Sequence, residues 1–147
     1  KEVSGMISAI IHAISRTLQL EFGDRYHIYM EEVKLGLKEP CFFIFCLNPS
    51  NQLFVGRRYL RKNPFCIHYF PEQGGHENEE CHEVAGRLFL CLELLDIQGN
   101  QVRGTAMRYE VADGMLHFFV AYHQFVDKKA PPLPIMEELE EEISARG

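Results

Sequence analysis

The opening stretch of the chain carries a helical pattern of apolar positions. From Val3 to Leu18 these positions recur at steps of three and four, which places them on one stripe of a helix. The stripe consists of Val3, Met6, Ile7, Ile10, Ile11, Ile14 and Leu18. Gly23 follows and can adopt the positive φ that ends many helices, so we expect the first helix to stop there.

A second helical stripe lies in the middle of the chain, between Cys81 and Leu95. Its members are Cys81, Val84, Ala85, Leu88, Cys91, Leu92 and Leu95. Asn78 can cap this helix, and Glu79 and Glu80 fall in its first turn, where the helix dipole favours carboxylates. The pattern predicts a second helix that reaches Leu95.

Alternating or continuous apolar runs predict the strands. These runs are residues 24–32, 41–47, 65–70, 103–111 and 115–126. The last two flank Asp113-Gly114, which is a signal for a tight hairpin turn. We therefore expect an α+β fold in which a four- to five-stranded antiparallel sheet packs against two helices.

A Pro-rich connector, residues 128–134, follows the last predicted strand. Pro134 can occupy the first turn of a short acidic helix. The apolar positions on one side of that helix are Ile135, Leu139 and Ile143. We divide the chain into a domain at residues 1–127 and a connector with an acidic C-terminal helix or arm at residues 128–147.

The predicted sheet holds more apolar side chains than two helices can cover. Both alternating sets in residues 41–47 are apolar, so Phe43 and Phe45 face away from Phe42 and Ile44, and the last strand repeats this pattern. Because soluble monomers seldom expose so large an apolar patch, we expect a neighbouring chain to cover the second face. The alternative is that the C-terminal helix folds back over it.

Composition narrows the class of protein. The 147 residues, 46% of them hydrophobic, suit one domain with one core. With 15 Lys and Arg against 21 Asp and Glu, the net charge of -6 predicts no overall attraction to nucleic acid or anionic lipid. No stretch has the character of a membrane span or signal peptide. The five cysteines lie in apolar segments, which predicts reduced thiols in the core.

The sequence contains one weak candidate for a metal site. Residues 76–83 hold His, Glu and Cys side chains, and Cys66 and His68 are near in sequence. Neither a Cys-x-x-Cys pair nor a His-Glu-x-x-His motif is present, so we predict no metal ligand, no cofactor and no catalytic residue. The alternative, a small metal-dependent hydrolase, would have to use His68, His76, Cys81 and His82.

A basic cluster interrupts this acidic chain on a predicted hairpin. Its members are Arg57, Arg58, Arg61 and Lys62, which flank Tyr59 and Leu60. Four cations on one hairpin suit an acidic protein partner better than a nucleic acid, so we interpret the cluster as an interface. A solvated hairpin face and a nucleic-acid-binding module are the alternatives. The predicted subunit or tube interface is Arg57, Arg58, Tyr59, Arg61, Lys62, Phe43, Phe45, Ile135, Leu139 and Ile143.

Several segments, taken in order, resemble the phage tail terminator family. They are residues 29–43, Leu47-Asn48-Pro49-Ser50, Arg58-Tyr59-Leu60-Arg61, residues 65–71, Arg103-Gly104-Thr105-x-Met107-Arg108-Tyr109-Glu110 and Asp113-Gly114-x-Leu116-His117-Phe118-Phe119. The resemblance is to members from Firmicutes prophages with contractile tails, and it spans roughly residues 1–127. Its weight comes from the order of the segments, because none of them is a catalytic signature.

The resemblance implies a structural subunit and no enzymatic activity. Such a subunit would form a homohexameric ring on the last ring of the tail tube, stop tube and sheath polymerisation, and link to the neck or collar. The implied partners are further copies of the chain, the tail tube protein and the tail sheath protein, with a neck or collar protein beyond them. DNA would meet the ring only while passing through its lumen, and no membrane partner is implied.

The implied location is the tail end nearest the head or collar, in a virion or a phage-tail-like bacteriocin particle. Assembly would take place in the bacterial cytoplasm, which agrees with reduced cysteines. A neck or head-tail completion protein is the alternative within the same class.

Overall fold

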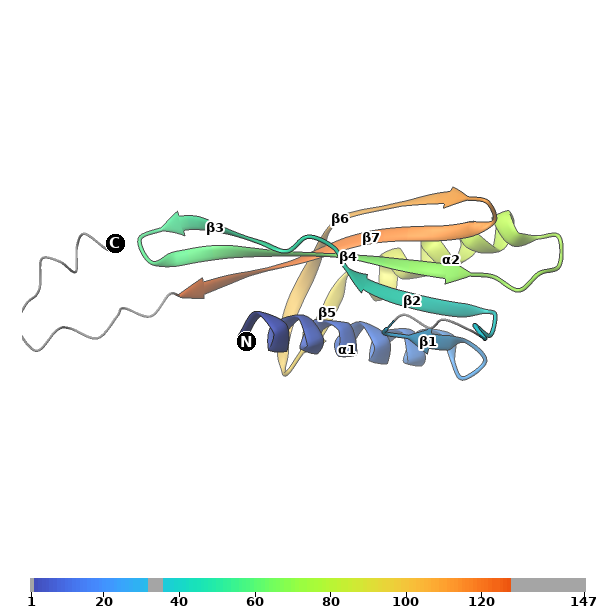
Figure 1. Cartoon of the computed structure of the whole chain (residues 1–147), viewed down its shortest axis with the longest axis horizontal. Helices are drawn as coiled ribbons and strands as arrows, with labels where there is room; N and C mark the ends of the chain where they lie inside the picture. Colours follow the sequence, from blue (N-terminus) through green and yellow to red (C-terminus); the bar gives the residue numbers. More distant parts are fainter. Residues whose placement is uncertain (1, 32–35, 128–147) are drawn as a thin grey trace, which may run out of the picture.

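Two helices pack against one face of a twisted sheet in the computed structural model, which describes residues 2–31 and 36–127 (Figure 1). The elements are α1 (Glu2–Phe22), β1 (His27–Tyr29), β2 (Cys41–Cys46), β3 (Ser50–Val55), β4 (Arg58–Phe70), α2 (Glu77–Cys91), β5 (Leu94–Ile97), β6 (Asn100–Ala112) and β7 (Met115–Asp127). The sheet has the strand order β1-β2-β4-β7-β6-β5, and β3 pairs with β4 outside this path. The α+β class predicted from the sequence is confirmed.

The helices form where the apolar stripes predict them. In α1, Ile10, Ile14 and Leu18 are fully buried against the sheet. The helix ends before Gly23, whose φ is 90° and whose N–H donates to the Gln19 carbonyl at 3.0 Å. This positive φ is the reason that glycine terminates the helix here, as predicted.

Helix α2 differs from its prediction at both ends. Its N-cap is His76 rather than Asn78, and the side chain of His76 makes no capping hydrogen bond. At the other end the helix stops at Cys91, and Leu95 is a buried residue of β5. The predicted helix was too long because Leu95 continues the helical spacing of apolar residues. Leu95 is buried in the same core, but it reaches that core from a strand.

The predicted number of strands was too small, and the prediction of a purely antiparallel sheet was wrong. The described residues form a seven-stranded sheet in which β1 pairs with β2 in parallel. The strand predicted within residues 24–32 is present as β1, only three residues long, whereas two strands with weak signals were missed: β5 is only four residues long, and β3 contains Ser50, Asn51 and Gln52. Tertiary pairing rather than propensity makes these segments extended.

The core lies between the two helices and the facing rows of β2, β4 and β7. Its largest fully buried side chains include Phe42, Phe65, Tyr69, Phe118 and Tyr122. The β6–β7 hairpin turns through Asp113 and Gly114, whose φ values are 55° and 72°. These positive values confirm the predicted tight turn, because they match the twist of two adjacent strands.

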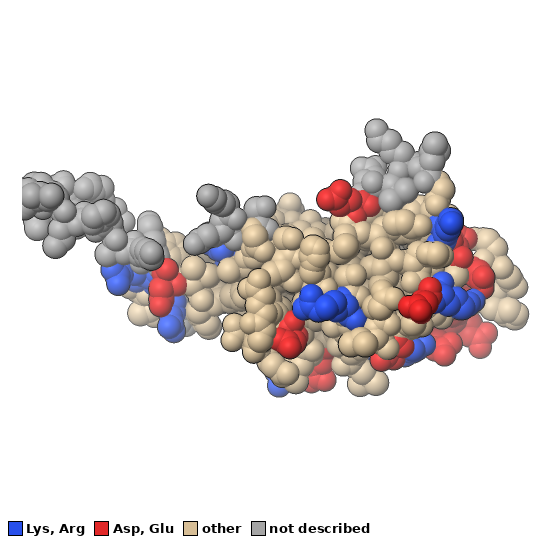
Figure 2. Space-filling model, turned by 90° about the horizontal axis from the view of Figure 1, so that it is seen from below, with Lys and Arg blue, Asp and Glu red and all other residues tan. Residues whose placement is uncertain are grey.

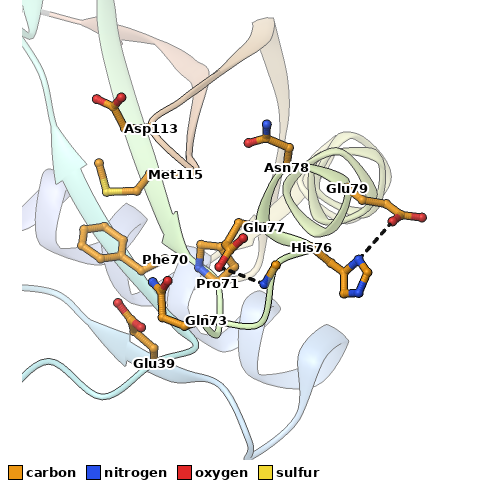
Figure 3. Close-up of a pocket in the computed structure, with 12 residues that line it drawn as sticks. Glu39, Phe70, Pro71, Gln73, His76, Glu77, Asn78, Glu79, Asp113 and Met115 are labelled. Atoms are coloured by element: carbon orange, nitrogen blue, oxygen red, sulfur yellow. Dashed lines mark hydrogen bonds and ion pairs between the residues drawn. The ribbon is translucent and has the colours of Figure 1, made fainter.

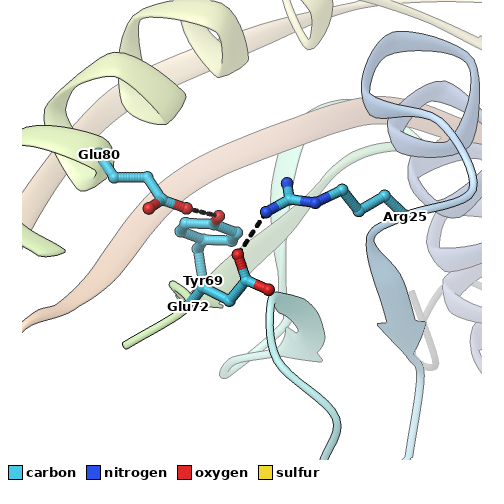
Figure 4. A network of polar contacts seen from close by, with 4 residues as sticks. All are labelled: Arg25, Tyr69, Glu72 and Glu80. Carbon is cyan, nitrogen blue, oxygen red and sulfur yellow. Dashed lines mark hydrogen bonds and ion pairs between the residues drawn. The ribbon is translucent and has the colours of Figure 1, made fainter. Parts of the chain in front are cut away.

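Polar contacts tie the ends of these elements together at one end of the sheet (Figure 4). The Tyr69 hydroxyl on β4 donates to the Glu80 carboxylate on α2, and Arg25, after α1, pairs with Glu72, after β4. Burial, followed by the hydrogen bond to Glu80, raises the pKa of Tyr69. The loops after α1 and β4 are thereby held beside the start of α2.

Two sequence predictions fall outside the described residues. The Pro-rich connector and the acidic helix occupy residues 128–147, so they stay predictions, as does the division at residue 127. No helix among the described residues combines the length and hydropathy needed to cross a membrane.

Candidate assembly surface

Three strands extend past the helices as an arm (Figure 1). We define the arm as β3, residues 58–62 of β4 and residues 123–127 of β7. The register runs from Val55 opposite Arg58 to Ser50 opposite Lys62, and β7 pairs along the other side of β4. Because β2 pairs only with residues 65–70 of β4, the arm has a separate edge strand, β3.

The tip of the arm holds part of the predicted basic cluster. The Arg58 Nε atom lies 3.4 Å from the Asp127 Oδ1 atom, and both side chains are more than half exposed. The Arg58 guanidinium also lies 5.5 Å from the centroid of the Phe125 ring. An exposed ion pair of this kind contributes little to stability. Arg57, next to it at the turn, is exposed.

The base of the arm holds the rest of the cluster in a different environment. Arg61 is only 8% exposed, its Nε donates to the Asn51 Oδ1 at 2.9 Å, and its Nη1 lies 3.7 Å from the Met6 sulfur. Tyr59 and Lys62 are half-buried. Arg61 therefore joins the arm to α1, and the exposed cations of the predicted interface are Arg57 and Arg58.

Exposed apolar side chains gather on the arm. Leu53 is 60% exposed, Val55 64% and Phe125 54%. Val55 is paired with Arg58, and Arg58 covers part of the Phe125 ring, so Val55 and Phe125 share one face of the arm, whereas Leu53 is paired with Tyr59 on the other face. Apolar groups surrounded by charges in this way are typical of protein interaction sites.

The uncovered face of the sheet is less open than the sequence suggests. Phe43 is 6% exposed, and its ring stacks on that of Phe45 with centroids 4.7 Å apart. Phe45 in turn lies edge-on to His68, and the Arg108 guanidinium sits 4.0 Å from the centroid of Phe119. Neighbouring rings and an arginine thus cover much of this face within the chain, whereas the arm keeps its apolar groups exposed.

Acidification should weaken the fold through His123, at the base of the arm. Burial, and secondly the nearby Lys62, lower the pKa of His123, and its Nδ1 has no hydrogen-bond partner among the described residues. Neutral His123 therefore contributes to the free energy of unfolding. This contribution is complete above the unfolded-state pKa of about 6.5, and it is lost as the pH falls through the lower folded-state pKa, because protonation then favours the unfolded chain. Urea denaturation between about pH 7 and pH 5 would measure this loss.

Two variants serve as controls for that pH dependence. His123→Gln should remove this part of it, and Lys62→Met should reduce it, because Lys62 is the second cause of the lowered pKa. An unchanged pH dependence in His123→Gln would contradict the assignment.

The remaining predicted interface residues, Ile135, Leu139 and Ile143, lie outside the described part of the chain. Seen from the side on which α1 lies, the rest of the surface mixes acidic and basic side chains (Figure 2). A surface of mixed sign gives no extended basic track for a nucleic acid backbone on this side.

A hollow of about 600 Å³ opens where α2 begins (Figure 3). It is acidic, with Glu39, Glu77, Glu79 and Asp113 in its lining. The Glu77 carboxylate accepts hydrogen bonds from the N–H groups of Gly74 and Gly75, and backbone hydrogen bonds, first from the N–H of Glu77 itself and then from Gly74 and Gly75, lower its pKa. Glu77 therefore caps the loop before α2, which is a structural role.

The residues that a hydrolase would need are spread over the molecule. Cys81 is buried with its Sγ 3.7 Å from the Gly114 carbonyl oxygen, and the His82 ring contacts the Tyr109 hydroxyl at 2.8 Å. His76 is exposed beside Glu79. His68 lies on the uncovered face of the sheet, whereas Cys81 belongs to the core on the other side. The fold does not bring these four side chains into one site.

A projecting arm that exposes Leu53, Val55 and Phe125 is a feature of proteins that assemble with other subunits. The chain is a member of the phage tail terminator family: residues 9–133 match the family described as "Phage tail terminator protein". This match covers most of the chain and confirms the family indicated by the ordered segments. The family is structural, so the chain is a phage tail structural protein, associated with other tail proteins in the virion.

Other comparisons add little. A search of curated proteins finds no match. One solved structure aligns over 82% of this chain and 97% of its own chain, at 11% sequence identity and a TM-score of 0.35. A likeness this weak supports no inference about function.

Proposed function

We propose that this chain forms a homohexameric ring that caps the end of a contractile tail tube. The ring stops polymerisation of tube and sheath and links the tail to the neck or collar. It sits at the tail end nearest the head, or at the collar of a headless bacteriocin particle, after assembly in the bacterial cytoplasm. The tail tube protein, the tail sheath protein and a neck or collar protein are its neighbours.

The observation that carries the proposal is the arm, with its exposed apolar groups. Leu53, Val55 and Phe125 are each more than half exposed in the single chain, which favours their burial against another subunit. Among the described strands β3 pairs only with β4, so its other edge is available to a strand of a neighbouring subunit. Pairing of this head-to-tail kind closes into a ring when the rotation per subunit allows it.

The charges at the tip are consistent with an acidic neighbour. Arg57 and Arg58 add positive charge to an arm that belongs to a chain of net charge -6. An arm of opposite sign to the rest of the subunit is attracted to the body of the next copy, which favours one mode of contact. The acidic segment at residues 137–142 is one candidate partner in that copy.

The length distribution of tails tests the proposed role most directly. We expect a lysogen or operon that lacks only this gene to produce overlong or ragged tubes, because nothing then stops polymerisation. Electron microscopy of the particles measures the lengths, and expression of the gene in trans should restore them. Tails of normal length without heads would instead assign the protein to the neck, and unaffected particles would refute both roles.

A further inference from the structure

A cysteine and two histidines meet on the uncovered face of the sheet. Cys66 and His68 are two residues apart on β4, so both side chains point to the same face. His117 on β7 is the cross-strand partner of His68. One ligand atom from each of the three side chains lies within 4.8 Å of the others. The sheet register alone therefore creates a cluster that no sequence motif indicates.

The geometry of the cluster is close to that of a metal site. The facing nitrogens, His117 Nδ1 and His68 Nε2, are 2.9 Å apart. Tetrahedral zinc has bonds of about 2.0 Å to nitrogen and about 2.3 Å to sulfur, which places its ligand atoms roughly 3.3 to 3.6 Å from one another. Small rotations of the two rings and of the thiol are enough to reach these separations.

The surroundings of the cluster suit a bound cation. Cys66 is 3% exposed, and Phe45 and Phe70 pack against the His68 ring, so water has limited access. Burial, and secondly His117, lower the pKa of His68, which favours the neutral imidazole that binds metals. Burial raises the pKa of Cys66 to about 11, so a metal has to displace the thiol proton into solvent.

We propose that Cys66, His68 and His117 form a zinc site. One thiolate and two neutral imidazoles are ligands that zinc prefers, and a reducing compartment keeps the thiol available. The three ligands join the strands β4 and β7 on the uncovered face of the sheet, opposite the core residues Phe65, Ile67 and Phe118. The site is independent of the terminator role, because its residues come from the sheet face and not from the arm.

The fourth coordination position belongs to solvent or to a carboxylate. Glu110 is the cross-strand partner of His117 on β6, and its charge raises the pKa of Cys66, although the Arg108 charge lowers that pKa by more. Its carboxylate is held by Arg108 at 3.2 Å. Release from Arg108 would let Glu110 complete the coordination of the ion; with the pair to Arg108 intact, a water molecule would occupy the fourth position.

Titration of the reduced, full-length protein with Co²⁺ tests this site. Cobalt replaces zinc in such sites and reports a bound thiolate by a charge-transfer band in the near ultraviolet. We expect one ion per chain with that band, displacement of the cobalt by Zn²⁺, and a higher melting temperature with Zn²⁺ present. Absence of the band in the unaltered protein overturns the proposal.

Matched variants separate this site from other thiols and imidazoles. Cys66→Ser should abolish the band. His117→Gln removes a ligand, so it should weaken cobalt binding by more than the loss of a ligand's hydrogen-bond partner does, which costs about 10- to 100-fold in affinity. Cys91→Ser and His82→Gln alter a cysteine and a histidine outside the cluster, and they should bind cobalt like the unaltered chain. A band that persists in Cys66→Ser refutes the site.

The fold of the variants is checked by circular dichroism before titration. If Cys66→Ser fails to fold, the cobalt titration of the unaltered protein tests the site without that variant. One thiolate-bound cobalt per chain in it, kept in Cys91→Ser, supports the site, and its absence refutes the site.

Discussion

Replacing Gly104 by alanine should destabilise the fold strongly, although the substitution adds only one methyl group. A Cβ atom at this position would lie 2.8 Å from the Leu92 carbonyl oxygen, 2.9 Å from Val120 Cγ2 and 3.3 Å from Tyr122 Cε1. None of these neighbours can move easily. The Leu92 oxygen accepts the Tyr122 hydroxyl at 2.6 Å, and the Gly104 N–H donates to the Glu93 carbonyl at 2.8 Å.

The clash therefore forces β6 away from the segment that follows α2. Overpacking of this kind costs about 3 kcal/mol, and both hydrogen bonds weaken at the same time. For a domain of this size we expect the melting temperature to fall by about 10 °C. Thermal unfolding followed by circular dichroism measures the change.

Gly86→Ala is the matched control for that substitution. Gly86 is an exposed residue of α2, and a Cβ built there meets nothing within 4 Å. Because alanine favours helix over glycine, this variant should be more stable by roughly 0.5 to 1 kcal/mol. If Gly104→Ala melted at the temperature of the unaltered protein, the close approach of β6 to Leu92 would be wrong.

Replacing Phe125 by glutamate should abolish ring assembly and leave the subunit folded. The ring is 54% exposed in the single chain, so the substitution removes little core packing. In an assembled ring the same site would bury a carboxylate, which costs about 2 to 4 kcal/mol or more for each interface. Size-exclusion chromatography with light scattering distinguishes monomers from rings.

Leu90→Glu is the matched control for the arm. Leu90 is 77% exposed on α2, away from the arm, so it tests the same change of charge and polarity elsewhere on the surface. We expect this variant to assemble normally. Rings formed by Phe125→Glu would show that the arm is not the subunit interface, and monomers formed by Leu90→Glu would extend the interface to α2.

Arg58→Glu is a better probe of the basic tip than any change at Arg61. Arg58 is exposed, whereas Arg61 is 8% exposed and bonded to Asn51, so its replacement would disturb the base of the arm itself. The sequence treats both as members of one cluster, because they are three residues apart. In a strand that odd spacing places the two side chains on opposite faces.

The parts of the fold that were predicted correctly depend on local patterns. The stripe that ends at Leu18, the glycine at position 23 and the turn at Asp113-Gly114 each act within a few residues. The missed strands β3 and β5 are extended because of partners far along the chain: β3 pairs with β4, and β5 with β6. Their own residues contain too little apolar alternation to predict this.

The cluster of Cys66, His68 and His117 likewise combines a local feature that the sequence indicates with a distant partner that only the structure reveals. In the sequence, Cys66 and His68 group with residues 76–83, because those are near in the chain. The structure places His117 beside His68, although 49 residues separate them. A signal was present, since Cys66 and His68 share one face of a strand, but the third member depends on the register of β4 with β7.

The sequence by itself determined the family, the α+β class, the two helices and the main hairpin, because periodicity, turn residues and ordered segments are local properties of the chain. Only the tertiary structure decided which cations reach solvent, which apolar groups stay exposed and which ligand atoms meet. These depend on how far β4 and β7 extend past the helices and on their register. Register is set by the packing of the whole sheet, and no local segment specifies it alone.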